Sequence, residues 1–151
     1  QNLFKFEFAY DIDKAPELYV RKSIKAFIDD AILMPHQTIP DTYNVTSSGF
    51  RKLRLYSIFL KTYFESYWIV LGFFQKNSQD SIKAKDRLKK IEASGKQMYK
   101  RHEIDCPEAL SKVSYQNAIE YFTSKGIKGS ENTEKIEFYA EAIQKALKTL
   151  Q

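Results

Sequence analysis

The stretch FRKLRLYSIFLKTYFESYWIVLGFF, residues 50–74, decides the fold, because its apolar side chains cover nearly every side of a helix. A helix without a polar face belongs in the centre of a core or in a bilayer. Spanning a bilayer takes about 20 mostly apolar residues. Here Arg54, Lys61 and Glu65 interrupt the run, and its longest uncharged part is 66–75. We therefore expect a central core helix, or one that packs against a further domain, rather than a membrane span.

Helical periodicity continues on both sides of this central stretch. Apolar residues recur at steps of three and four, which is typical of helices with one buried face. Ser47 and Ser48 are the expected cap of the central helix. The other expected helices are 13–30, capped by Asp13; 82–99; one that starts at 105–108 and closes at Gly126; and a last one that ends at Leu147.

Short strands and turns are expected between the helices. Tyr43 and Val45 lie among threonines and follow a turn at Pro40, which favours a strand. Residues 135–139 alternate apolar and polar side chains and are a second candidate strand, while 3–8 are a strand or an apolar arm. The sequence thus predicts a mainly α fold of about five helices with one or two short β-hairpins.

Two segments of the chain echo each other. SIKAFIDDAI at 23–32 and AIEYFTSKGI at 118–127 share Ile, Phe and Ile at equivalent positions. Each is an expected helix followed by a turn-rich stretch and a candidate strand. A helix followed by a small hairpin is the order found in winged-helix-like modules. A module of that kind, binding nucleic acid or protein, is therefore the alternative interpretation of this chain.

Length and composition are those of one globular domain over residues 1–151, with 43% hydrophobic and 28% charged residues. Cys106 is the single cysteine, which excludes an intramolecular disulfide and a cysteine-rich metal site. The chain begins with Gln1 rather than Met and has no basic stretch followed by an apolar one. We therefore expect no signal peptide and interpret the chain as a piece of a longer protein or a processed one.

The positive charge of the chain is concentrated between Asp80 and Arg101. Eight cations stand against three acids there, which leaves the +5 that the whole chain carries. Such a segment fits an anionic lipid surface, an acidic protein or phosphates, and it equally fits a solvated helix face. Aromatic residues do not alternate with the cations as they do in single-strand binders, so nucleic acid is not the expected partner. The candidate contacts with an anionic surface are Lys83, Lys85, Arg87, Lys89 and Lys90.

Two pairs of residues have a spacing that catalysis uses elsewhere. His36 and Asp41 have the pattern H-x4-D, in which an aspartate orients a histidine that acts as a base. Cys106 lies four residues after His102 and is a nucleophile only if its thiol is activated. A turn rich in proline surrounds the first pair, and no phosphate-binding motif accompanies it. We therefore expect a surface loop and a structural cysteine.

Three stretches together resemble the C-terminal region of the glycerol-3-phosphate and dihydroxyacetone-phosphate acyltransferase family. The first is LFKFEFAYDID at 3–13, which leads to a helix ending in FIDDAIL. The second is LYSIFLKTYFESYWIV at 55–70, with its core F-E-S-Y-W at 64–68. The third is PEALSKVSYQNAIEYFTSKGI at 107–127. The resemblance covers nearly the whole chain in one register.

The resemblance implies that catalysis belongs to an upstream acyltransferase domain, which carries an H-x4-D motif and phosphate-binding motifs. His36 and Asp41 match that motif in spacing alone and fall downstream of where such a domain ends, so we assign no catalytic residue, cofactor or metal to this chain. The implied parent enzyme transfers an acyl chain from acyl-CoA or acyl carrier protein to the sn-1 hydroxyl of glycerol 3-phosphate in phospholipid biosynthesis.

The resemblance also suggests partners and a location. We expect a non-catalytic accessory region that packs on the upstream catalytic domain, and that faces an anionic membrane surface or an acidic acyl carrier protein. The expected location is cytoplasmic, peripheral at the cytosolic face of a membrane. Glu65, a charge inside an apolar run, either pairs with Lys61 or is buried against a partner. The candidate residues for packing between domains are Phe64, Glu65, Tyr67 and Trp68.

Overall fold

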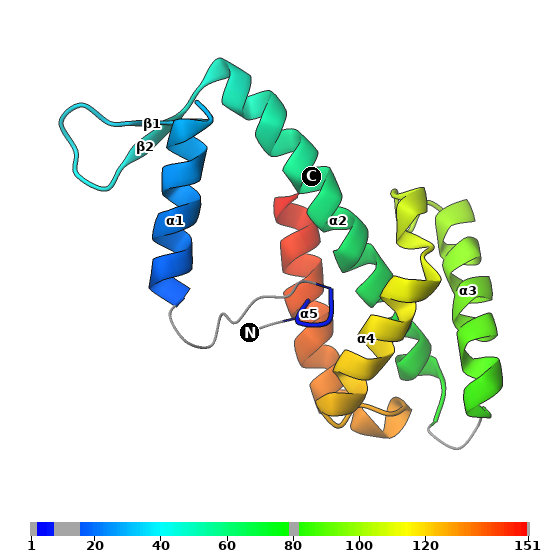
Figure 1. Cartoon of the computed structure of the whole chain (residues 1–151). Coiled ribbons are helices and arrows are strands. Elements are labelled where there is room, and N and C mark those ends of the chain that lie inside the picture. Colours follow the sequence, from blue (N-terminus) through cyan, green and yellow to red (C-terminus); the bar gives the residue numbers. More distant parts are fainter. Residues whose placement is uncertain (1–2, 8–15, 79–81, 151) are drawn as a thin grey trace. The chain divides into compact units, whose positions relative to one another are not determined.

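The computed structural model of the chain describes residues 3–7, 16–78 and 82–150. Helices dominate these residues, and the single sheet among them is one antiparallel hairpin (Figure 1). The predicted mainly α fold of about five helices with a short hairpin is therefore confirmed. The elements are α1 (Pro16–Asp29), β1 (Leu33–Pro35), β2 (Tyr43–Val45), α2 (Ser47–Lys76), α3 (Ala84–Lys100), the 3-10 helix η3 (Pro107–Ala109), α4 (Lys112–Ser124), the 3-10 helix η4 (Ser130–Asn132) and α5 (Thr133–Thr149).

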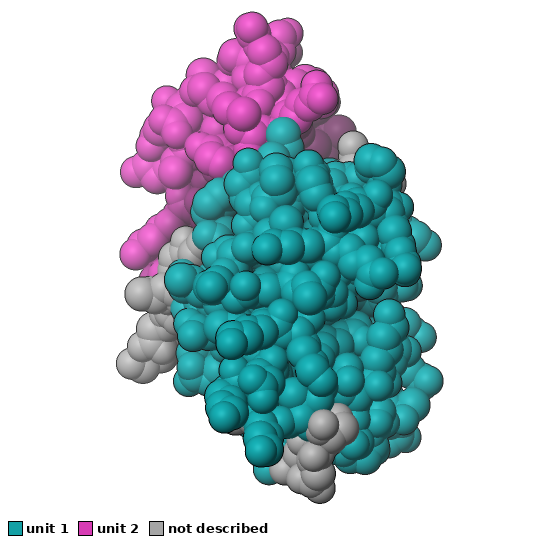
Figure 2. All heavy atoms as spheres, turned by 90° about the vertical axis from the view of Figure 1, so that its right-hand side faces the viewer, with its two compact units in different colours: residues 1–9, 58–151 teal, residues 10–57 magenta. Residues whose placement is uncertain are grey.

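The chain divides into two compact units, coloured separately in Figure 2. Unit 1 comprises residues 1–9 and 58–151, and unit 2 comprises residues 10–57. Helix α2 runs through the boundary, so that its first turns belong to unit 2 and the rest belongs to unit 1. The expectation of a single domain over 1–151 stays a prediction.

The core of unit 1 is built around the second half of α2. This half buries residues on all sides, among them Tyr67, Ile69, Val70, Leu71 and Phe74. Helices α3, α4 and α5 surround it and supply the rest of the cluster, including Ile91, Tyr115, Tyr121, Phe122, Ile136 and Ile143. The predicted central core helix is confirmed. Within the described residues, no helix combines the length and the apolar character needed to cross a membrane.

A short arm at the N-terminal end of unit 1 covers one side of α2. Residues 3–7 form turns rather than a strand, and Phe8 of the predicted segment lies outside the described residues. The ring of Phe4 lies 4.8 Å from the ring of Phe64 and 5.1 Å from that of Tyr67, measured between centroids. Of the two predicted alternatives, a strand or an apolar arm against a helix, the arm is therefore correct.

Unit 2 consists of α1, the hairpin and the first turns of α2. In the hairpin Leu33 pairs with Val45, and the pairing continues to Pro35 opposite Tyr43. Buried Ile32 links the three elements, because its carbonyl accepts the backbone N–H of Thr46 at 3.0 Å just before α2 begins. The predicted strand at 43–45 and the first helix are confirmed, while Asp13, the predicted cap of that helix, lies outside the described residues.

The cap of α2 lies one residue before the predicted serines. Thr46 Oγ1 accepts the backbone N–H of Gly49 at 2.8 Å, and both serines are already inside the helix. Gly49 is required there, because a Cβ atom would collide with the carbonyl group of Ile32. The close approach of two backbones therefore determines where α2 begins.

Two predicted boundaries in unit 1 are wrong. Residues 135–139 are helical and belong to α5, because Ile136 and Ile143 are buried at helical spacing while Phe138 is 68% exposed. The stretch 105–108 starts only the turn η3, and α4 begins at Lys112 after a cap in which Ser111 Oγ accepts the backbone N–H of Ser114 at 3.4 Å. The second segment of the echo is thus followed by η4 and a helix instead of a hairpin, which removes the repeat behind the winged-helix interpretation.

Two glycines in the helices of unit 1 differ in their surroundings, and the same substitution should shift stability in opposite directions. A Cβ on Gly95 would collide with the hydroxyl of buried Tyr115 and lie 3.1 Å from Leu110 Cδ2, whereas a Cβ on Gly72 meets nothing within 4 Å. We expect Gly95→Ala to lower the free energy of unfolding by about 1–3 kcal/mol through overpacking. Gly72→Ala should raise it by up to about 1 kcal/mol through helix propensity.

Urea unfolding followed by circular dichroism compares the two variants directly. An equal rise in stability for both variants would contradict the packing described around Gly95.

Candidate functional site

The cations of α3 lie in two rows on opposite sides of the helix. With about 100° between successive residues, the inner side carries the buried or half-buried Leu88, Ile91, Gly95 and Met98. The candidate contacts do not share one face. Lys85 and Lys89 point to one side and are continued by Lys96 and Lys100; we name these four the outer row. Arg87 and Lys90 point to the other side, and Lys83 is the residue just before the helix; we name these three the groove row.

All four lysines of the outer row are exposed. None of them forms an ion pair with a carboxylate in the part of the chain that the structure describes. Glu92, one of the two acids on the same helix, pairs instead with Lys112 at 3.3 Å. Lys96 and Lys100 were not among the candidate residues, although their spacing of eleven and fifteen residues from Lys85 is a signal that sequence reasoning can detect.

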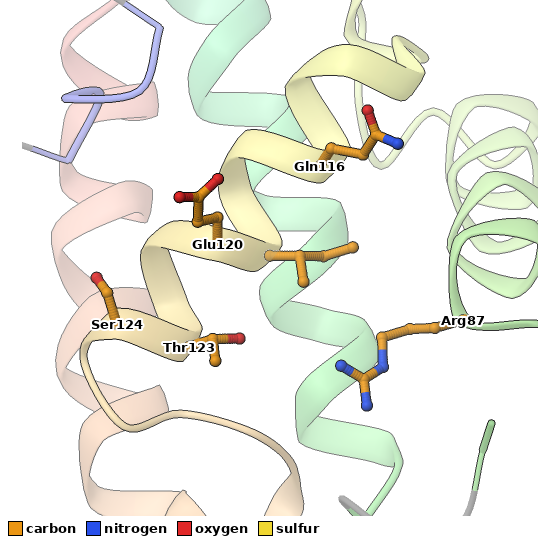
Figure 3. A pocket seen from close by; sticks show the side chains of 6 residues that line it. Arg87, Gln116, Glu120, Thr123 and Ser124 are labelled. Atoms are coloured by element: carbon orange, nitrogen blue, oxygen red, sulfur yellow. The ribbon is translucent and has the colours of Figure 1, made fainter. Parts of the chain in front are cut away.

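Arg87, the middle residue of the groove row, lines a groove between α3 and α4 (Figure 3). Arg87 extends from α3 toward α4, and its guanidinium carbon lies 6.0 Å from the centroid of the Phe74 ring. This contact with an aromatic face holds the guanidinium in place. The groove has a volume of about 550 Å³ and is lined by Arg87, Gln116, Ile119, Glu120, Thr123 and Ser124.

The α4 wall of the groove differs from the α3 wall in charge. It offers a carboxylate, an amide and two hydroxyl groups, with the half-buried Ile119 between them. The hydroxyl of Ser124 already donates to the carbonyl of Tyr121 at 2.7 Å, so Thr123 and Gln116 remain as the neutral polar groups available to a ligand. The groove therefore has a positive edge on α3 and the negative Glu120 on α4.

Glu65 performs a structural task inside unit 1. Its carboxylate is 2% exposed and accepts the backbone N–H groups of Asp105 at 2.9 Å and Cys106 at 2.7 Å. Lys61 lies 3.9 Å from the same carboxylate and also pairs with Asp105. The neighbouring Ser66 donates to the carbonyl of Ala109 at 2.8 Å. Glu65 thus lies near Lys61, as the first alternative has it, and is buried against another segment of its own chain; burial against a partner stays a prediction.

The other candidate packing residues also face the core of unit 1. Tyr67 is fully buried, and its ring lies 6.0 Å from that of Tyr121 between centroids. Burial raises the pKa of the Tyr67 hydroxyl. Phe64 and Trp68 are half-buried and pack against the same cluster. A contact between either of them and another domain stays a prediction.

The histidine and cysteine candidates occupy structural positions. The Nδ1 atom of His36 faces the backbone N–H groups of Thr38 at 3.3 Å and Ile39 at 3.2 Å. An acceptor at Nδ1 cannot at the same time donate to an orienting aspartate, which is what the H-x4-D arrangement needs. Cys106 is buried, and burial is the main cause that raises the pKa of its thiol. Among the described residues, no three His, Cys, Asp or Glu side chains gather as metal ligands do.

In unit 1 the buried side chains of Glu65 and Ser66 form hydrogen bonds with the backbone of the same chain. The lysines of the outer row lie on its surface. Residues 1–131 match the family model of the glycerol-3-phosphate acyltransferase C-terminal region, so the chain belongs to that family. The family predicted from the three sequence stretches is thereby confirmed, while α5 lies beyond the matched residues. No curated protein and no solved structure is significantly similar to the chain.

Removing the Glu65 carboxylate should destabilise unit 1. Glu65→Leu leaves the buried backbone N–H of Cys106 and the part-buried N–H of Asp105 without their acceptor. We expect a loss of about 2–4 kcal/mol in the free energy of unfolding. Glu65→Gln keeps one carbonyl acceptor and should lose less.

Urea unfolding measures the effect of both substitutions. Glu141, exposed on α5, supplies the matched control Glu141→Gln, which should change little. Equal losses for Glu65→Gln and Glu141→Gln would contradict the role given to Glu65.

A second carboxyl group in unit 1, that of Glu7, is half-buried in the arm. One of its oxygens accepts from the Asn117 amide at 3.0 Å, and the other is buried without a hydrogen-bond partner among the described residues. Burial raises the pKa of this carboxyl, and the Asn117 hydrogen bond opposes the rise. The native state therefore binds this proton more tightly than the unfolded state does. The resulting stabilisation of unit 1 is present at acidic pH and is lost as the pH rises through the native pKa.

Glu7→Gln should therefore stabilise the protein at pH 7, because the amide keeps an acceptor for Asn117 without a buried charge. The difference from the unsubstituted protein should shrink toward pH 4. Urea unfolding at both pH values tests this, and a variant that is less stable at pH 7 would contradict it.

Proposed function

We propose that this chain is the accessory C-terminal region of a glycerol-3-phosphate 1-O-acyltransferase. The parent enzyme transfers an acyl chain from acyl-CoA or acyl carrier protein to the sn-1 hydroxyl of glycerol 3-phosphate, and its catalytic residues belong to an upstream domain. The single observation that carries this proposal is the match of residues 1–131 to the family of that region.

The geometry of the His36 loop supports a non-catalytic role. A general base of the H-x4-D type needs an aspartate that accepts from Nδ1, and here Nδ1 is turned toward two backbone N–H groups of its own loop. The imidazole is thus held by the turn that connects β1 to β2. The chain contributes packing and binding surfaces to the parent enzyme, and the reaction takes place elsewhere.

Exposed apolar side chains in unit 2 support a contact with the catalytic domain. Five large apolar residues of this unit are more than half exposed, and a contact with another domain would bury them. They come from all three parts of the unit and are Val20, Met34, Ile39, Phe50 and Leu55. The upstream domain is the proposed partner, because it belongs to the same chain and is therefore always close to the accessory region.

The outer row supports a location at the cytosolic face of a membrane. Near an anionic lipid surface each Lys contributes on the order of 1 kcal/mol. The four exposed lysines of the outer row lie on one side of α3, so each of them could contribute in this way. The region is then a peripheral component at the membrane surface.

A transplant tests the accessory role. An acyltransferase of this family that lacks its own C-terminal region should recover the acylation of radiolabelled glycerol 3-phosphate by palmitoyl-CoA when this chain is joined in its place. The double variant Phe50→Asp with Leu55→Asp should fail to restore activity, because a docking surface would be charged. Arg51→Asp on the same helix is the matched control and should restore it.

The purified chain alone should not acylate glycerol 3-phosphate. Acyl transfer by the chain alone that His36→Ala abolishes would overturn the proposal, and so would a transplant that fails with the unsubstituted chain.

A further inference from the structure

We propose that the groove between α3 and α4 binds an acidic amphipathic helix of a partner protein. The contact goes beyond the accessory role, does not depend on it, and uses a different surface from the outer row. Three features support it: Arg87 in the groove with Lys83 and Lys90 before and after it in the sequence, an apolar floor, and the carboxylate of Glu120 on the α4 wall.

The groove row forms a positive edge with a fixed centre. Arg87 is half-buried and held over the Phe74 ring, so its guanidinium loses little freedom on binding. Lys90 lies one turn after it on the same side of α3, and Lys83 lies four residues before it, just ahead of the helix. The three cations span about 10 Å along the helix. Carboxylates one turn apart on a partner helix match that length.

The floor of the groove is apolar. The half-buried Ile119 lies between the polar side chains of the α4 wall. A volume of about 550 Å³ accommodates the side chains along one face of a helix. This is the geometry in which an amphipathic helix lays an apolar stripe in a groove and points its polar residues to the rims.

Glu120 distinguishes a helix from a lipid surface. It lines the groove from α4, and its carboxylate points away from Arg87 in Figure 3. A flat layer of phosphates would place negative charge against Glu120 as well as against Arg87. A helix instead presents carboxylates to α3 and a neutral or basic residue to α4, because its side chains point in different directions about its axis. Charge complementarity therefore favours a helix that is acidic along one edge.

Fluorescence anisotropy with a defined peptide tests the proposal on the full chain. The probe is a fluorescein-labelled 16-residue peptide with glutamates along one helical edge, leucines along the centre and lysines along the other edge. The double variant Lys83→Gln with Lys90→Gln should weaken binding roughly five- to tenfold. Both side chains are exposed, so the fold should be retained. Arg87→Gln should also weaken binding.

The outer row supplies a matched control. The double variant Lys85→Gln with Lys89→Gln removes the same charge from the same helix on the opposite side. It should change peptide affinity by less than about twofold. Equal losses in the two double variants would overturn the proposal, because the peptide would then respond only to net charge.

Glu120→Gln tests the polarity of the groove. It should weaken binding of the probe, whose lysine edge faces Glu120, and strengthen binding of a second peptide in which glutamates replace those lysines. An identical effect on both peptides would contradict the proposed orientation. Failure of both peptides to bind at any salt concentration would overturn the proposal itself.

Vesicles of phosphatidylglycerol and phosphatidylcholine distinguish a lipid from a helix as the occupant. Vesicle binding should fall in the outer-row variant and persist in the Lys83 and Lys90 variant. The reverse result would assign the groove to lipid and overturn the proposal. None of these measurements uses acyltransferase activity, so their outcome is separate from that of the transplant.

Discussion

The second half of α2 constrains the rest of unit 1, because a helix that is apolar on every side is stable in water only when it is surrounded. Helices α3, α4 and α5 and the arm at 3–7 supply that cover. Polar groups on such a helix must find partners inside the core. Glu65 does so by accepting two backbone N–H groups, and this determines the path of the chain between α3 and η3.

The central helix was predictable from its sequence, because a helix with apolar side chains on nearly every side has few stable environments. The residues at which the helices begin were less predictable. Residues 135–139 fit a period of two as well as a helix, and only the burial of Ile136 and Ile143 against the core decides between the two. The cap at Thr46 depends on the close backbone of Ile32, and the turn η3 depends on Glu65, forty residues earlier. Contacts between distant segments leave no local signal.

The candidate surface was predictable in composition and only partly in geometry. The eight cations between Asp80 and Arg101 are plain in the sequence, and seven of them form the two rows described above. That Arg87, in one of these rows, lines a groove follows from how α3 packs on α4, which the sequence does not reveal. The role of Glu120 follows in the same way, since it lies more than thirty residues from Arg87 in the sequence and lines the same groove only in the folded chain.

The family match ends at residue 131, whereas the core continues into α5 through Ile136 and Ile143. The edge of recognisable similarity is therefore not the edge of the folding unit. The last helix of a core needs only apolar side chains of suitable volume at helical spacing. Many different sequences satisfy this requirement, so the sequence of such a helix can diverge while its packing is kept. A fragment trimmed to the matched residues would lose one wall of its interior and leave Tyr121 and Phe122 without their cover from Tyr139.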